Sequence, residues 1–361
     1  MTNLSRPYIL NETAPTCPLP SQYPPGSLRF DLLVNLLSAW IVAGLFLDGW
    51  YHNTVQNKVE SFVTPWHALL YSGLLATGIV LTFTYVRNVE HGYNWRRALP
   101  RGYIAALVGF VVFGLSGIAD FAWHSLFGFE FNVEALLSPP HLALAASMVP
   151  LLIAPFRAAW SRPAAEEKSG WRGRLPALLS LLFVVSVFTF FTQFANAFTH
   201  ANVLAGQSLT AGDTYYRDVT GLASILIPTG IEMAFILLAI RRWVLPVGSL
   251  TLVLTANAAL MYFLGIHFSG QHWPVLLAAF GGGVLADVLL FVSKPSPQRV
   301  GALRVFAFVT PFVTYLLYFL ALNLAGGVVW RIHMWLGVAF LAGVVGLGLS
   351  VLLAPPAIPE Q

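Results

Sequence analysis

The sequence predicts an all-α integral membrane protein with about ten transmembrane helices. Of its 361 residues, 57% are hydrophobic and only 9% are charged, whereas soluble domains carry about 25% charged residues. Apolar stretches of about 20 residues, the length that spans a bilayer, recur along the chain. The basic residues lie in short connections between these stretches and not on one stripe, which is not the pattern of a nucleic-acid-binding surface.

The chain divides into two tails, ten expected spans and a basic loop. Residues 1–28 form a polar, proline-rich tail without the apolar run of a signal peptide, and residues 354–361 form the second tail. Residues 29–160 make two hairpins, 161–176 a basic loop, and 177–353 three further hairpins. The expected spans are 29–51, 66–86, 102–125, 140–158, 177–199, 219–240, 246–268, 273–293, 302–325 and 332–353.

The distribution of Lys and Arg predicts the orientation. All but three of the 19 basic residues lie near the N-terminus or near the connections that follow even-numbered spans; the exceptions are Lys58, Arg217 and Arg331. Because positively charged connections stay in the cytoplasm, both termini are expected there. The expected location is a cell membrane, with the bacterial inner membrane as the compartment.

One polar motif occurs twice, at the expected extracytoplasmic ends of the first two hairpins. The first copy is Asp48-Gly-Trp-Tyr-His52 followed by Glu60-Ser-Phe-Val-Thr64-Pro65-Trp-His67. The second is Asp120-Phe-Ala-Trp-His124 followed by Glu134-Ala-Leu-Leu-Ser138-Pro139-Pro140-His141. Because the chain has so few charges, their repetition in one pattern indicates two polar sites.

The spacing within the motif indicates metal ligation. Asp and His four residues apart at a helix end project from one face. Thr64 and Ser138 are expected N-caps, each followed by proline. The last histidine of each copy then lies in a first helical turn, where the dipole favours a neutral, ligating imidazole. The predicted ligands are Asp48, His52 and His67 in one site and Asp120, His124 and His141 in the other.

Two glutamates accompany these ligands. Glu60 and Glu134 are expected as fourth ligands or as hydrogen-bond acceptors that orient a histidine ring. For a single copy, a capping or snorkelling Asp–His pair at the headgroup level explains the residues equally well. Two copies that keep both spacings favour metal.

Histidines near the outer ends of later spans indicate that the five hairpins are quasi-repeats of one unit, with the last three degenerate. Asn196 with His200 is a candidate third site, although the second histidine of the motif is missing there. His267 and His272 are a candidate pair without the acid.

Glu232 and Asp287 are acids inside expected spans. Intramembrane acids generally face the bundle interior or a wet cavity. They are expected either to belong to a proton path or, more simply, to hydrogen-bond to a neighbouring helix.

The doubled motif resembles the C subunit of the copper membrane monooxygenases, the particulate methane and ammonia monooxygenases. That subunit is similar in carrying two successive motifs of Asp, three residues, His, about a dozen residues and His, the second beginning with Asn or Asp. The resemblance covers residues 30–160 and keeps the order and the separation of about fifty residues between motifs. It implies that the six predicted ligands bind copper in an oxygen-activating enzyme.

The chain departs from that family in several respects. The gaps between the histidines, 14 and 16 residues, are slightly longer than in the family, and no segment resembles the cupredoxin-type domain of its partner subunit. The segments Phe46-Leu-Asp-Gly-Trp50 and Thr64-Pro-Trp-His-Ala68 also resemble uncharacterised bacterial multi-span proteins. The resemblance is therefore expected to extend to the metal sites rather than to the substrate.

The expected function is oxygen-dependent oxidation of a small or lipophilic substrate, by this chain alone or as one subunit. Copper is the expected cofactor; iron and zinc suit the same ligands, and zinc would indicate a hydrolase. The alternatives are metal acquisition, delivery or sensing without catalysis, a proton-coupled transporter, and a bis-histidine haem protein. The expected partners are membrane lipid, other membrane subunits and a periplasmic donor of metal or electrons.

Overall fold

The computed structural model describes residues 22–54, 64–128, 130, 133–163, 169–206 and 214–355. In these residues the chain is all-α and forms no β-strand. The first seven α-helices are α1 (Leu28–Thr54), α2 (Pro65–Glu90), α3 (Ile104–Phe127), α4 (Val133–Leu137), α5 (Pro139–Leu152), α6 (Ala154–Trp160) and α7 (Gly170–Phe191). They are followed by α8 (Ala201–Leu204), α9 (Thr214–Arg242), α10 (Ser249–Leu264), α11 (Ile266–Ser269), α12 (Val275–Ser293), α13 (Val300–Leu324) and α14 (Ile332–Leu353). Short 3-10 turns are η1 (Trp95–Arg97), η3 (Gln193–Ala195) and η4 (Gly270–His272).

The described part of the chain contains nine helical segments that are long and apolar enough to cross a membrane, so the multi-span class is confirmed. The segment Pro139–Trp160, made of α5 and α6, counts as one of them. The prediction of ten spans is corrected, because the seventh expected span contains α10, which has only 16 residues. The chain then continues through α11 and η4 as short turns.

The end of α10 is set by a close approach of two backbones. A Cβ atom on Gly265 would lie 1.8 Å from the carbonyl oxygen of Thr199, so only glycine fits there. Thr199 belongs to a stretch expected to be helical, but α7 ends at Phe191. Beyond it the side chain of Asn196 accepts hydrogen bonds from the backbone N–H groups of Phe198 and Thr199, which holds a turn. The expected span 177–199 is therefore wrong in its last turns.

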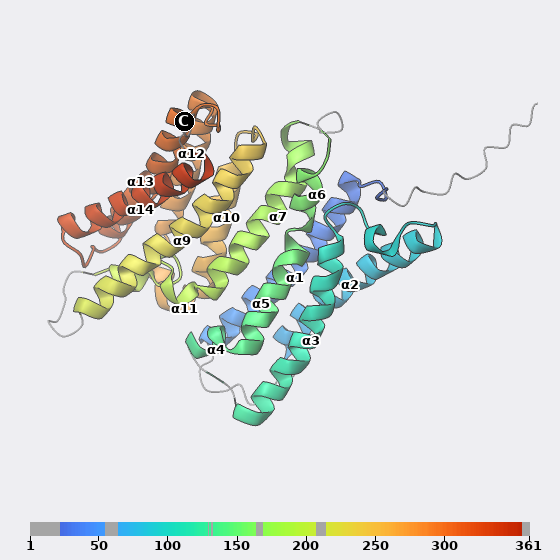
Figure 1. Ribbon diagram of the computed structural model, residues 1–361. Helices are drawn as coiled ribbons and strands as arrows, with labels where there is room; N and C mark the ends of the chain where they lie inside the picture. The colour runs from blue at the N-terminus through green and yellow to red at the C-terminus, as the bar shows by residue number, and fades with distance from the viewer. Residues whose placement is uncertain are drawn as a thin grey trace, which may run out of the picture.

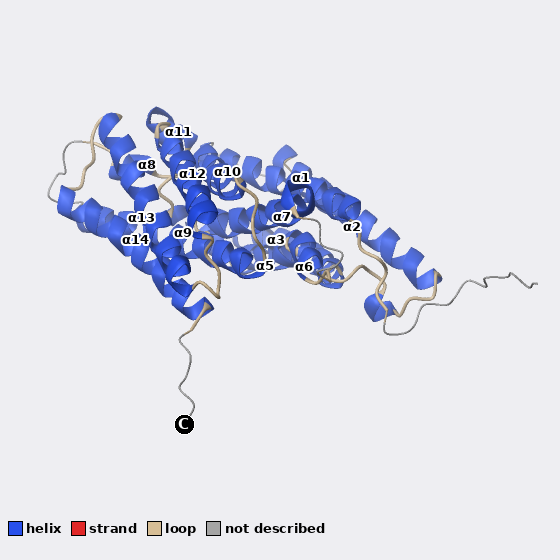
Figure 2. Cartoon of the chain, turned by 90° about the horizontal axis from the view of Figure 1, so that it is seen from above, coloured by secondary structure: helices blue, strands red, loops and turns tan. Residues whose placement is uncertain are grey.

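The helices form an elongated bundle (Figure 1). Seen from above, α1, α2, α3, α5 and α6 lie on one side, α9, α12, α13 and α14 lie on the other, and α10 lies between them (Figure 2). α7 joins the two sides, because it packs against α1, α6 and α10. The first, second, fourth and fifth expected hairpins are packed helix pairs, whereas α9 packs more extensively against α14 than against α7.

The intramembrane acids make hydrogen bonds to neighbouring helices. Asp287 on α12 accepts bonds from the backbone N–H groups of Leu250 and Thr251, at 3.2 and 2.8 Å, and from the hydroxyl of Thr251 at 2.6 Å. It therefore caps the N-terminus of α10 from another helix. Glu232 on α9 accepts a bond of 2.9 Å from the side-chain amide of Asn257 on α10. The simpler of the two expectations for these acids is confirmed.

Replacing Asp287 by alanine is expected to destabilise the protein by about 1–3 kcal/mol, because buried donors at the start of α10 lose their acceptor. Asp287→Asn keeps one acceptor oxygen and should lower stability less. Thermal unfolding in detergent, followed by circular dichroism, measures both effects. An alanine variant that unfolds at the wild-type temperature would contradict this role.

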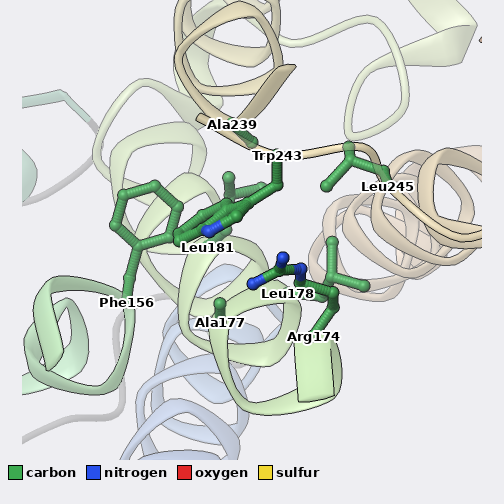
Figure 3. Close-up of a pocket in the computed structure, with 8 residues that line it drawn as sticks. All are labelled: Phe156, Arg174, Ala177, Leu178, Leu181, Ala239, Trp243 and Leu245. Atoms are coloured by element: carbon green, nitrogen blue, oxygen red, sulfur yellow. The ribbon is translucent and has the colours of Figure 1, made fainter. Parts of the chain in front are cut away.

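At the end of the bundle opposite to the two Asp/His motifs, the helices pack around Trp243. The guanidinium carbon of Arg174 lies 5.3 Å from the centre of the Trp243 ring, a cation–π contact. Figure 3 shows these residues around a narrow crevice, which leaves no room for a water molecule. The crevice is lined by Phe156, Arg174, Ala177, Leu178, Leu181, Ala239, Trp243 and Leu245. Its form is that of helix packing and not of a ligand pocket.

Candidate metal centres

The six predicted ligands lie at one end of the bundle. Each Asp–His pair stands near the C-terminal end of a helix, α1 or α3, and each last histidine lies in the first turn of the next long helix, α2 or α5. Because these helices pair as hairpins (Figure 1), the two copies of the motif come to the same end. The basic residues Arg96, Arg97, Arg101 and Arg162, in the connections that follow α2 and α6, lie at the other end.

The first cluster contains Asp48, His52 and His67. The Nε2 atom of His67 lies 3.3 Å from Oδ2 of Asp48, and Nε2 of His52 lies 3.7 Å from Oδ1 of the same carboxylate. One potential ligand atom from each residue lies within 4.8 Å of the others. Since Zn²⁺ or Cu²⁺ ligands stand about 2.0–2.2 Å from the ion, this spacing fits one cation between them.

The second cluster contains Asp120, His124 and His141. The Nε2 atoms of both histidines lie 3.4 Å from the same oxygen, Oδ1 of Asp120. The centres of the two imidazole rings are 5.5 Å apart, and one potential ligand atom from each residue again lies within 4.8 Å of the others. Two aromatic nitrogens and one carboxylate oxygen therefore converge on one point.

Two carboxylate oxygens at these points lack a hydrogen-bond donor. Oδ1 of Asp48 and Oδ1 of Asp120 are buried atoms without a hydrogen-bond partner in the described part of the chain. A buried acceptor left without a partner is unfavourable by about 1–3 kcal/mol, and more when charged. A cation bound in each cluster would satisfy the carboxylate oxygen of that cluster, so the residues present fit a metal ion.

The two last histidines are held in different ways. The hydroxyl of Thr64 accepts a bond of 3.1 Å from the backbone N–H of His67, which confirms the predicted N-cap. Ser138 is the N-cap residue of α5, as predicted, but its side chain makes no capping hydrogen bond. Its hydroxyl instead lies 2.7 Å from Nδ1 of His141 and orients the ring, which leaves Nε2 directed at Asp120.

The acid near the second cluster is not the expected one. Glu134 lies on α4 with an exposed side chain and outside the group of converging ligands. Glu130 is the acid that approaches: its Oε2 lies 3.3 Å from Nδ1 of His124. The pattern shared by the two motif copies points to Glu134 and Glu60, so Glu130 was missed. Glu60 lies outside the described residues.

The two clusters are near enough for their charges to interact. His52 of the first cluster interacts electrostatically with His124 and His141 of the second. The phenol of Tyr71, one turn beyond His67 on α2, interacts with both Asp48 and Asp120. Sequence reasoning did not single out this tyrosine, because only the packing of α2 against α3 brings it between the two motifs.

The remaining candidates do not assemble a third site among the described residues. Asn196 is used in the turn described above. His200 and His272 lie outside the spanning segments, and burial lowers the pKa of each ring. His267 is exposed. None of these belongs to a group of three ligands that could hold an ion.

No family model, curated protein or solved structure matches this chain. The class of this protein therefore rests on its own fold and candidate sites. It is a multi-span helical membrane protein with two Asp/His/His groups, each of which could hold a metal ion.

Proposed function

We propose that the protein is a copper-binding membrane protein that acts in oxygen-dependent oxidation of a small or lipophilic substrate, alone or as one subunit of a complex. The observation that carries the proposal is the second cluster, where two imidazole nitrogens face one buried carboxylate oxygen that has no donor. Two imidazoles and a carboxylate suit Cu(II), Fe(II) and Zn(II). The resemblance of the doubled motif to the copper membrane monooxygenases favours copper among them.

The residues of each cluster would hold the metal and keep positions open. Asp48, His52 and His67 supply three donors in one site, and Asp120, His124 and His141 supply three in the other. A copper ion bound in this way supplies a centre that can bind and activate dioxygen. The chain's own contribution is to fix the donors through Thr64 and Ser138 and to exclude solvent by burial of Asp120.

A lipophilic substrate fits the place of the second cluster in the helix. Asp120 on α3 is buried, whereas the adjacent Phe121 and the later Leu126 and Phe127 expose their side chains. Exposed apolar side chains on a spanning helix face lipid. A molecule dissolved in the bilayer can therefore reach the end of α3 without crossing water.

The orientation of the protein is part of the proposal. The basic connections lie at the end of the bundle opposite to the clusters, and the positive-inside rule puts such connections in the cytoplasm. The clusters then face the extracytoplasmic side, where a periplasmic protein could deliver metal or electrons. The similarity of the two motif copies is in keeping with duplication of a hairpin unit.

Metal delivery without catalysis is the second candidate. The side chain of His52 is 38% exposed, and an accessible ligand favours exchange of metal with a partner. The transporter alternative is weaker, because the hydrogen bonds of Glu232 and Asp287 account for both acids.

Elemental analysis of the full-length protein, purified in detergent without added metal, tests the proposal. We expect stoichiometric copper, up to two ions per chain, and a type 2 Cu(II) signal in electron paramagnetic resonance. A protein that carries no stoichiometric metal would contradict the proposal, and zinc alone would exclude the copper chemistry. Oxygen consumption by the reduced, copper-loaded protein with added lipophilic substrates separates oxidation from metal delivery, which predicts none.

A further inference from the structure

We propose that Glu130 is a positioning residue of the second cluster, whose carboxylate orients the His124 ring for metal binding. The inference rests on the proposed function in one respect, that the clusters bind a divalent transition-metal ion. It concerns a residue that neither the repeated motif nor the resemblance to the monooxygenases includes.

The first step is the environment of the His124 ring. Its Nδ1 atom lies 3.3 Å from Oε2 of Glu130 and 3.2 Å from the carbonyl oxygen of Gly128. Both of these oxygens are acceptors, so Nδ1 is the nitrogen that carries the proton. The lone pair is then on Nε2, the atom that lies 3.4 Å from Oδ1 of Asp120. Glu130 and Gly128 thus favour the tautomer that can ligate through Nε2.

The second step is that Glu130 is itself held in place. Its Oε1 accepts a hydrogen bond from the indole N–H of Trp123, the residue that precedes His124 on α3. Its Oε2 is buried and has no hydrogen-bond partner of good geometry in the described residues, so the His124 ring is the polar group it faces. One carboxylate therefore contacts two consecutive side chains at the end of α3, through a hydrogen bond from Trp123 and a 3.3 Å approach to the His124 ring.

The third step compares the two clusters. In the second cluster both imidazoles have an Nδ1 contact, with Glu130 for His124 and with the hydroxyl of Ser138 for His141. Its Asp120 and His124 side chains are 2% and 8% exposed and that of His141 is 24% exposed. In the first cluster Asp48, His67 and His52 are 14%, 13% and 38% exposed. Oriented, buried ligands lose less entropy on binding and exchange more slowly. The carboxylate also adds a second negative charge beside Asp120.

The effect of losing this contact follows from similar metal sites. Loss of a carboxylate that faces the second ring nitrogen of a ligating histidine typically lowers metal affinity 10–100-fold. We expect that range for Glu130→Gln at the second cluster. Glu130→Asp keeps the charge but shortens the reach, and should recover part of the loss.

The test uses the full-length chain with His52→Ala, so that the second cluster is measured alone. The protein is stripped with a chelator and titrated with Cu(II) against a competing chelator of known affinity. The added variants are Glu130→Gln, Glu130→Asp and Glu134→Gln, with Glu90→Gln as the matched control, because Glu90 is an exposed acid at the other end of α2. Glu130→Gln should bind Cu(II) 10–100-fold more weakly, and Glu90→Gln should not change the affinity.

Two further measurements separate positioning from a general structural role. The Cu(II) resonance spectrum should change in Glu130→Gln, because the orientation and basicity of a ligating ring change, while the unfolding temperature of the metal-free protein stays near that of its parent. Unchanged Cu(II) affinity in Glu130→Gln, or an equal loss of affinity in Glu134→Gln, would overturn the role assigned to Glu130 and leave the proposed function standing. A His52→Ala protein that binds no Cu(II) would overturn the proposed function as well.

Discussion

Asp120→Ala is expected to abolish metal binding at the second cluster and to leave one metal ion per chain in the first. The reason is geometric: both Nε2 atoms of this cluster lie 3.4 Å from one oxygen of Asp120. Without that oxygen the two neutral imidazoles keep neither a third donor nor a negative charge. Elemental analysis after loading with Cu(II) and removal of excess metal measures the loss.

The first cluster supplies the reciprocal variant. Asp48→Ala removes the carboxylate that lies 3.3 Å from His67 and 3.7 Å from His52, so it should also leave one ion per chain. The double variant Asp48→Ala, Asp120→Ala should retain none. A double variant that still binds two ions would place the metal elsewhere and refute both sites.

Metal binding should also raise the free energy of unfolding of the protein. A ligand that binds only the folded protein stabilises it by about 4 kcal/mol at a free concentration 1,000 times its dissociation constant. Chelation should therefore lower the unfolding temperature of the wild-type protein. In the double variant the chelator should have no effect, which separates loss of metal from loss of fold.

The sequence was sufficient for the class of fold and for the two Asp/His/His groups that could hold a metal ion. The class follows from composition and span length. The bilayer sets both of these requirements, whatever the particular packing of the helices. The two groups follow from local geometry: Asp and His four residues apart share a helix face, and Thr64 fixes the first turn that carries His67. Both are short-range relations, which a linear pattern can contain.

The parts that were missed depend on contacts between distant segments or on loop conformation. The length of α10 depends on the approach of Gly265 to the carbonyl of Thr199, 66 positions earlier. Tyr71 gains its place between the clusters only when α2 packs on α3. Glu130 was passed over because the shared motif points to Glu134, whereas it is Glu130 that lies 3.3 Å from the His124 ring. Ser138 occupies the expected N-cap position of α5, but its hydroxyl contacts Nδ1 of His141 instead of a backbone N–H group.

Asp31→Ala is expected to destabilise the protein strongly without altering its metal content. Asp31 lies at the start of α1 and is fully buried. It accepts hydrogen bonds from the phenol of Tyr103, at 2.6 Å, and from the guanidinium of Arg162. Burial and the neighbouring carboxylate raise the pKa of Tyr103 well above its ordinary value, so the phenol stays a donor.

The size of the effect follows from what is left behind. Removing one partner of a buried ion pair is unfavourable by about 3–5 kcal/mol, because the remaining charge is buried without compensation. Here the side chain of Arg162 is only 15% exposed. Asp31→Asn should lose less, since an amide oxygen can still accept from Tyr103. Glu90→Ala, an exposed acid at the same end of the bundle, is the control and should unfold like the wild type.

This variant also tests whether stability and metal binding are separate properties of the two ends of α1. Asp48 lies 17 positions after Asp31, about 25 Å along a helix. Asp31→Ala should therefore unfold at a lower denaturant concentration or temperature, yet carry the wild-type number of metal ions at a temperature where it is folded. An unchanged unfolding midpoint would show that the Asp31–Arg162 pair is dispensable. Loss of metal from the folded variant would show that the two ends of the helix are coupled.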